Sequence, residues 1–380
     1  MSLSFALAPE QEEFRAVVGD FADEVIAPVA DDINAQGRFP TDIVRRMAEV
    51  GLFGIPFDER YDGMGGDFLT LCLAIEEIGR VDQSLGITLE AAVGLGAAPL
   101  DGFGTDEQKE RWLPELCRGE RIGAFGLSEP GGGSDNLGGT TTRAARDGDD
   151  WVINGSKVFI TNAGTELTSI ITVTAWTGDD EMTAIIVPAG APGLTVAPPY
   201  RKVGWHASDT RELAFSDLRV PVANTLGEVG AGFRQFLQIL DDGRIAIAAL
   251  ATGLIQGCID ECVRYASERT AFGRPIGEHQ AIAFKIADFE VAAQASRHLY
   301  YNAAWRREQG LPYKKEASIA KLYSSEQAVT AAREATQIFG GYGFMTESRV
   351  GRFYQDAKVL EIGEGTSEIQ RILIARELGL

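Results

Sequence analysis

The chain has 380 residues, 45% of them hydrophobic and 24% charged, and this length suits two or three globular domains. Its formal net charge of −20 argues against nucleic acid as the main ligand, because a phosphate backbone is itself negative. The four cysteines predict no disulfide framework, the three histidines lack metal-ligand spacing, and no apolar run of about 18 residues predicts a membrane span, so we expect a cytoplasmic protein without a metal site.

The first 122 residues have the pattern of a helical domain. Apolar residues recur at helical spacing between Phe14 and Ile26, and Pro9 just before them favours a helix start. A second amphipathic run covers residues 71–78. A capping box at residues 105–108 predicts the start of another helix.

Residues 123–231 are rich in strand-forming segments. The run 151–161 predicts a hairpin turning at Asn154-Gly155. A second strand pair is expected from residues 169–175 and 182–187, and a further strand from residues 212–220. Several short strands without long helices between them predict a small barrel or sandwich.

The remainder, residues 232–380, is again helical. One long helix begins near Gly232 and contains Gly243, Gly253 and Gly257. Each interior glycine costs about 1 kcal/mol relative to alanine, so their presence predicts close approach by another helix or a ligand. Further helices are expected at 278–308, 314–339 and 367–378. Long helical segments joined by short loops predict an up-and-down four-helix bundle.

A glycine-rich loop opens the strand-rich region at residues 125–135. Three successive glycines follow Ser128 and precede Ser134, and they expose backbone N–H groups that can hold an anion or the polar edge of a heterocycle. The loop is no P-loop, since no Gly-Lys-Ser/Thr follows, and no Rossmann fingerprint, since no strand–helix unit surrounds it. A plain surface turn is the alternative.

Three further motifs carry possible ligand-binding chemistry. Phe159 and Thr161 could stack on and hydrogen-bond a flat ring, although such an aromatic more often belongs to a core. Arg269, at the end of the long helix, suits a phosphate group but also suits the helix dipole. The glycines of residues 337–343 could bring backbone N–H groups to a surface at a helix end.

An acidic residue between two glycines is the candidate for catalysis. Glu364 lies between Gly363 and Gly365, and Ser367 with Gln370 fits a capping box that starts the last helix. A carboxylate held in this way can act as a general base where water is excluded. The alternative is that Glu364 only complements the helix dipole.

Together these motifs resemble the acyl-CoA dehydrogenase family over nearly the whole chain, in the short- and medium-chain-like branch whose base lies in a C-terminal Glu-Gly-Thr motif. The resemblance implies a mainly α fold with a central β-barrel: a helical N-terminal domain (1–122), a β-barrel middle domain (123–231) and a C-terminal four-helix bundle (232–380). It also implies an FAD-dependent oxidoreductase of fatty acid metabolism that converts an acyl-CoA to the trans-2-enoyl-CoA. The implied partners are an electron-transferring flavoprotein and the other subunits of a homotetramer.

The resemblance also assigns roles to residues, with Glu364 as the catalytic base. The residues matched to FAD contacts are Phe125, Leu127, Ser128, Ser134, Phe159, Ile160, Thr161, Arg269, Phe272, Gln280, Gln337, Gly341, Thr366 and Glu368. Five of these residues are expected to contact an FAD in a neighbouring subunit: Arg269, Phe272, Gln280, Gln337 and Gly341. The residues matched to acyl-CoA contacts are Ser134, Asp241, Arg244 and Gly365.

The chain departs from some members of the family at two positions. Gly243 stands where other branches carry the base, so Glu364 has no substitute there, and Gly363 stands where many members carry tyrosine. The motifs leave other chemistries open on the same fold. These are an acyl-CoA oxidase, another flavin enzyme, a dehydrogenase of an acyl chain on a carrier protein, and a flavin-free acyl-CoA-binding protein.

Overall fold

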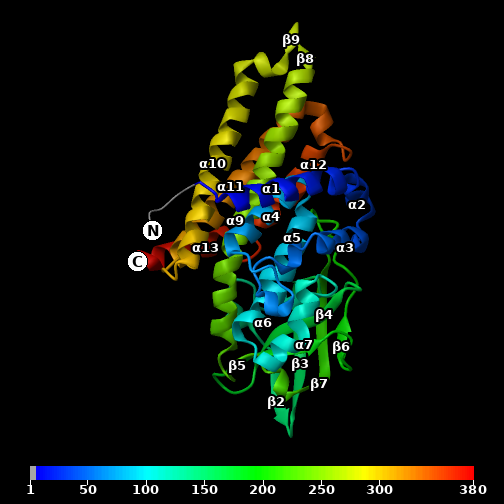
Figure 1. Cartoon of the computed structure of the whole chain (residues 1–380), viewed down its shortest axis with the longest axis vertical. Helices are drawn as coiled ribbons and strands as arrows, with labels where there is room; N and C mark the ends of the chain where they lie inside the picture. The colour runs from blue at the N-terminus through cyan, green and yellow to red at the C-terminus, as the bar shows by residue number, and fades with distance from the viewer. Residues whose placement is uncertain (1–5) are drawn as a thin grey trace.

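The computed structural model describes residues 6–380 as an elongated molecule, with long helices toward one end and the strands toward the other (Figure 1). The predicted start of the first helix at Pro9 and the capping box between Thr105 and Gln108 are both confirmed. The predicted helix at 71–78 is part of a longer one. The N-terminal helices are α1 (Pro9–Phe21), α2 (Ala30–Gln36), α3 (Thr41–Glu49), α4 (Phe68–Val81), α5 (Gln83–Glu90), α6 (Ala98–Phe103) and α7 (Asp106–Cys117).

Seven strands form one curled sheet in the order β1-β4-β2-β3-β7-β6, with β5 paired to β4. Within residues 6–380 the two edge strands, β5 and β6, do not pair, so the sheet is an open half-barrel rather than a closed barrel. The predicted pairing of 169–175 with 182–187 is confirmed. The strands are β1 (Ile122–Gly126), β2 (Arg143–Asp147), β3 (Asp150–Thr161), β4 (Thr168–Trp176), β5 (Met182–Pro188), β6 (Leu194–Val196) and β7 (Thr210–Pro221); a short helix, α8 (Asn136–Gly139), follows the glycine loop.

The predicted hairpin at Asn154-Gly155 is wrong, because β3 runs through these residues without turning back. The turn lies earlier, where Asp147 of β2 pairs with Asp150 of β3. The Asn154 side chain exchanges two hydrogen bonds with Asp217 of β7, at 3.0 and 2.9 Å. Gly155 lies at an irregularity in the β3–β7 register. A pairing between distant strands therefore overrides the local turn preference of the dipeptide.

The C-terminal region contains the three long helices that the sequence predicts, α9 (Gly232–Glu268), α10 (Gln280–Glu308) and α11 (Lys314–Phe339). They lie side by side in Figure 1, with the small hairpin β8 (Thr270–Ala271) and β9 (Arg274–Pro275) at the far tip. The sequence reasoning missed α12 (Arg349–Leu360), whose buried face includes the charged residues Arg352 and Asp356. The last helix, α13 (Ser367–Glu377), packs on α11.

The glycines inside α9 allow α4 to approach its backbone closely, as the sequence predicts. A Cβ atom at Gly253 would lie 2.3 Å from the carbonyl oxygen of Glu76, and one at Gly257 would lie 2.4 Å from that of Arg80. Among the described residues α9 is the one helix long and apolar enough to cross a membrane, but 83% of its apolar window is buried in the protein. α9 is therefore the central helix of the core.

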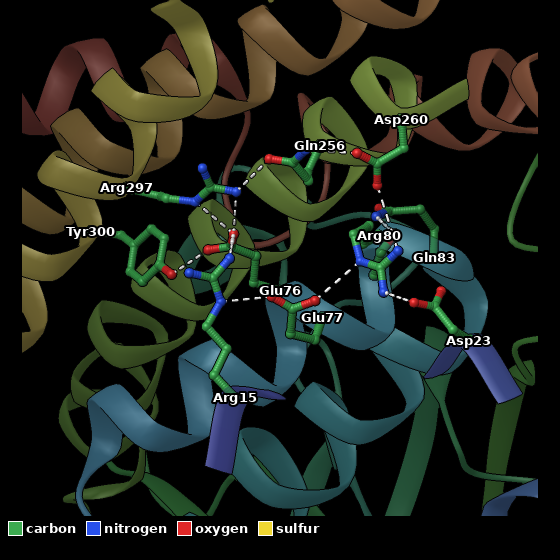
Figure 2. Close-up of polar contacts among 11 residues, drawn as sticks. Arg15, Asp23, Glu76, Glu77, Arg80, Gln83, Gln256, Asp260, Arg297 and Tyr300 are labelled. Carbon is green, nitrogen blue, oxygen red and sulfur yellow. Dashed lines mark hydrogen bonds and ion pairs between the residues drawn. The ribbon is translucent and has the colours of Figure 1, made fainter. Parts of the chain in front are cut away.

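A network of charged and polar side chains joins α1, α4, α9 and α10 (Figure 2). Glu76 of α4, which is 1% exposed, accepts a 2.7 Å hydrogen bond from Arg297 and a short one from the Tyr300 hydroxyl, both on α10. Arg15 of α1 lies 3.4 Å from the same carboxylate. Because the Glu76 carboxylate is buried, it depends on these partners for compensation of its charge.

Replacement of Arg297 by methionine should lower the free energy of unfolding by about 3 kcal/mol, because the Glu76 carboxylate would stay buried with one cation fewer. Arg371→Met provides the matched control, since the Arg371–Glu326 pair is exposed, with side-chain exposures of 53% and 35%. We expect that control to change stability by less than about 1 kcal/mol. Urea unfolding measures both, and equal losses in the two variants would refute a special role for the Glu76 network.

Candidate active site

The candidate base lies in a tight turn between α12 and α13. Glu364 has φ 53° and Gly365 has φ 91°, both in the left-handed region that is uncommon for a residue with a side chain. Two buried donors hold this turn: Lys321 Nζ of α11 and Gln370 Nε2 of α13 donate to the carbonyl oxygen of Gly365, at 2.8 and 2.9 Å. The backbone that carries Glu364 is therefore fixed from two helices.

The cap of α13 differs from the prediction by one residue. Thr366 is the N-cap, and its hydroxyl accepts a hydrogen bond from Ile369 N at 3.3 Å, whereas Ser367 is already the first helical residue. The predicted capping box between Ser367 and Gln370 is wrong, because the Gln370 side chain is used by the carbonyl oxygens of the preceding turn. Thr366 thus holds the end of the Glu364 turn in place.

The Glu364 side chain points back toward α9, and Gly243 makes room for it. The residue as a whole is half-buried, but both carboxyl oxygens are shielded from solvent. A Cβ atom on Gly243 would lie 2.0 Å from Glu364 Oε2, closer than any real contact. Gly243 therefore makes space for this carboxyl group, whereas Gly253 and Gly257 make space for α4.

A second acid, Glu90 at the end of α5, faces Glu364 and was missed by the sequence reasoning. Glu90 is 0% exposed, and within residues 6–380 no N–H or hydroxyl group donates to its carboxyl or to that of Glu364, which leaves the two carboxyls to each other. Burial raises the pKa of Glu90 well above its usual range, and the charge of Glu364 raises it further. We therefore assign Glu90 as protonated and donating to Glu364, since two adjacent carboxylates cannot both ionise. The signal available in the sequence was a glutamate inside the apolar run 85–93.

Burial raises the pKa of Glu364 to about 7, while Glu90, Lys321 and Arg244 oppose the rise. Lys321 responds in the opposite sense, because burial lowers the pKa of its ammonium group to about 8 in spite of Glu364. A carboxyl group whose pKa lies near neutral pH has the protonation behaviour that a general base needs there. The site can therefore accept a proton at Glu364.

Three of the four residues matched to acyl-CoA contacts lie around this carboxyl. Arg244 follows Gly243 on α9, is 4% exposed, and pairs with Asp241 one turn earlier. Its charge acts on Glu364, and Gly365 is the next residue in the turn. The fourth, Ser134, is exposed in the glycine loop. Their role in substrate binding remains a prediction.

The first group of residues matched to FAD lies on the glycine loop and β3. Phe125 is buried and stacks on Phe236 with ring centroids 3.9 Å apart, while Leu127 and Ile160 are also buried. Ser128 and Thr161 are half-buried. Phe159 differs from all of them: it is 68% exposed and has φ 62°. Its ring contacts that of Tyr200, with centroids 5.4 Å apart, but stays mostly exposed. The alternative, that Phe159 is a core residue, therefore does not apply.

The second FAD-matched group lies near the far ends of α9 and α11, away from the strands in Figure 1. Arg269 and Gly341 line one surface hollow of 470 Å³, and Gln337 lines an adjacent hollow of 1140 Å³. Phe272, in the β8–β9 hairpin, is 96% exposed, and Gln280 is exposed as well. The two FAD-matched groups, one on the glycine loop and β3 and the other at the far ends of α9 and α11, therefore lie on different parts of the surface of one chain. Thr366 caps α13, and Glu368 is exposed in its first turn.

No group of three His, Cys, Asp or Glu residues with the arrangement of a metal site occurs within residues 6–380. The four cysteines are free and buried. The absence of a resident metal remains a prediction from the sequence.

Sequence models of three domains match consecutive parts of the chain. They are described as acyl-CoA dehydrogenase N-terminal domain, middle domain and C-terminal domain, and they match residues 8–120, 124–218 and 230–379. The three matches together cover most of the 380 residues.

Individual proteins agree with this match along their whole length. A Bacillus subtilis protein named as a probable acyl-CoA dehydrogenase, YngJ, is 48% identical over 99% of this chain and 100% of its own. The structure of butyryl-CoA dehydrogenase from Megasphaera elsdenii superposes with a TM-score of 0.96 at 39% identity, covering all of both chains. A chain in the structure of the electron transferring flavoprotein of Acidaminococcus fermentans matches with the same TM-score and identity, over 99% of both chains.

The contact between Gly243 and Glu364 predicts a stability coupling between the two positions. Gly243→Ala should destabilise the protein by about 1–3 kcal/mol, because the new methyl group displaces a buried carboxyl. In a Glu364→Ala background the same substitution should cost much less, since the colliding group is gone. Gly102→Ala in α6 is the control: no atom lies within 4 Å of its would-be Cβ, so helix propensity should stabilise it by up to about 1 kcal/mol. An identical cost of Gly243→Ala in both backgrounds would exclude the contact.

Proposed function

The chain belongs to the acyl-CoA dehydrogenase family, and from this premise we propose that Glu364 is the base in an FAD-dependent α,β-dehydrogenation of an acyl-CoA thioester. The product is the trans-2-enoyl-CoA, and the electrons pass to an electron-transferring flavoprotein. The observation that carries the assignment is the Glu364 carboxyl itself, shielded from solvent and with a pKa raised to about 7.

The glycine loop and β3 fit an FAD ring system. The exposed ring of Phe159 supplies a flat apolar surface next to the half-buried hydroxyls of Ser128 and Thr161. A hydrogen bond of 2.9 Å from Val158 N to Ser128 O joins the loop to the strand that carries Phe159. When bound, FAD accepts the β-hydrogen of the substrate as a hydride.

The chain's own residues supply the proton chemistry. Glu364 would take the α-proton, which the adjacent thioester carbonyl makes acidic. Among residues 6–380 the backbone N–H of Glu364 has no hydrogen-bond acceptor, so it is free to donate to that carbonyl oxygen as negative charge develops there. Arg244 and Lys321 place two positive charges near the carboxylate, and protonated Glu90 donates a hydrogen bond to it while keeping its own proton. Together these groups hold Glu364 ready to accept one proton near neutral pH.

Several finer features are also proposals. The division into domains 1–122, 123–231 and 232–380 is supported by the change from helices to strands and back. A homotetramer is supported by the second FAD-matched group, because Arg269, Phe272, Gln280, Gln337 and Gly341 belong to the far ends of the long helices and the β8–β9 hairpin, where a neighbouring subunit's FAD would bind. A cytoplasmic location agrees with four free, buried cysteines, since thiols persist in reducing compartments.

Glu364→Gln tests the function most simply, because glutamine keeps the shape of the side chain but cannot accept the proton. The variant should fold, retain FAD and bind acyl-CoA, yet the rate of anaerobic flavin reduction by a good acyl-CoA substrate should fall by at least about 10²-fold. Stopped-flow bleaching of the flavin absorbance measures this rate with a panel of acyl-CoA chain lengths.

Glu361→Gln is the matched control for this variant. Glu361 is an acid three residues earlier in the same turn, and it pairs with Lys358, whose side chain is 65% exposed. We expect it to bleach the flavin at the wild-type rate. Rapid bleaching by the Glu364→Gln variant would show that Glu364 is only a helix-start acid.

A further inference from the structure

A fully buried ion pair lies behind the glycine loop. Lys157 Nζ of β3 lies 2.8 Å from Glu129 Oε1, and both side chains are 0% exposed. Lys157 precedes the exposed Phe159 by two positions on the strand, and Glu129 follows Ser128 in the loop. The pair therefore connects the two segments that the proposed FAD site uses, without itself reaching the surface.

The Lys157 ammonium group has three acceptors, two in the glycine loop and one in β4. Besides Glu129, Nζ donates to the carbonyl oxygen of Leu127 at 3.1 Å and to the hydroxyl of Thr174 in β4 at 3.1 Å. The bond to Leu127 holds the backbone of the glycine loop directly, and the bond to Thr174 anchors the ammonium group to the sheet. Loss of Lys157 would remove the side-chain link of the loop to β3 and β4, and would leave the backbone bond from Val158 N to Ser128 O.

The Glu129 carboxylate holds the other end of the same loop. Its Oε2 accepts hydrogen bonds from the backbone N–H and the hydroxyl of Thr141, at 2.6 and 2.8 Å, and from the N–H of Thr142 at 3.2 Å. These threonines follow α8 and lead into β2. Glu129 thus closes the loop from residue 129 to residue 142 around one buried carboxylate.

Stability alone is a poor explanation for this pair. Burying two charges costs several kcal/mol in desolvation, and well-packed apolar side chains of similar volume are often as stabilising. What an ion pair with several directed hydrogen bonds adds is a single geometry for the backbone segments that it joins. The segments joined here are the proposed binding surface for the flavin.

We propose that Glu129 and Lys157 are positioning residues that hold the glycine loop and Phe159 in the arrangement that binds FAD. The inference rests on the proposed function. Neither residue touches the flavin or the substrate, so their effect is on the affinity for FAD and on the orientation of its ring, and through these on the rate of flavin reduction.

The test compares Lys157→Met with the double variant Glu129→Gln/Lys157→Met, both studied as full-length holoenzyme. The single variant leaves a buried carboxylate without its cation, so it should lower both the melting temperature and the affinity for FAD. The double variant removes both charges and should recover most of the melting temperature. Because the loop still lacks the directed bonds of Lys157, its dissociation constant for FAD should stay raised by at least about 10-fold, which corresponds to about 1.4 kcal/mol. Its visible circular dichroism, which reports the asymmetry around the flavin ring, should also differ from wild type.

Glu76→Gln is the control for general loosening, since Glu76 lies in the buried network of the helices in Figure 2, outside the glycine loop. It should lower the melting temperature while leaving FAD affinity and visible circular dichroism unchanged. The proposal is overturned if the double variant binds FAD with wild-type affinity and dichroism, or if Glu76→Gln loses FAD to the same extent. A wild-type protein that binds no FAD would contradict the proposed function as well, so the two failures are distinguishable.

Discussion

The close contact between the Glu364 carboxyl and the bare α-carbon of Gly243 is the constraint on which the candidate site depends. A Cβ there would lie 2.0 Å from Oε2, so the carboxyl can occupy its position only against glycine. In this position both carboxyl oxygens are shielded from water, and the desolvation raises the pKa of Glu364 to about 7. The left-handed backbone of Glu364 and the bond from Lys321 to Gly365 are what aim the side chain at this gap.

The fold supports this contact from the side of α9 and α4. Gly253 and Gly257 let α4 lie against α9, and the Glu76 network binds α4 to α10 and α1. The chain passes from α4 directly into α5, whose last residue is Glu90. The packing that fixes α4 on α9 therefore also sets where the second carboxyl meets the first. The Glu76 network and the Glu90–Glu364 pair thus both depend on the contact between α4 and α9.

Much of this could be predicted from the sequence, because the signals were local. The periodicity of α1 and α9, the capping box at Thr105 and the isolated acid at Glu364 each lie within one segment. The misses depend on distant partners. Asn154-Gly155 looks like a turn until Asp217 of β7 occupies the Asn154 side chain. Glu90 is an unexplained charge in an apolar helix until the fold brings Glu364 beside it. The helix α12 has no clear apolar periodicity because its buried face carries the charged residues Arg352 and Asp356. The open edge of the sheet also follows from pairing that no single strand encodes.

The pH dependence of kcat/KM for anaerobic flavin reduction tests the central claim most directly, because it reports the ionisation of the free enzyme's base. Glu364 works only when deprotonated, so with a pKa near 7 the value should rise about tenfold per pH unit in acid and level off above about pH 7. The rise should persist across acyl-CoA chain lengths, because it belongs to the enzyme. A profile that is flat from about pH 5 to about pH 9 would contradict a desolvated Glu364 as the base.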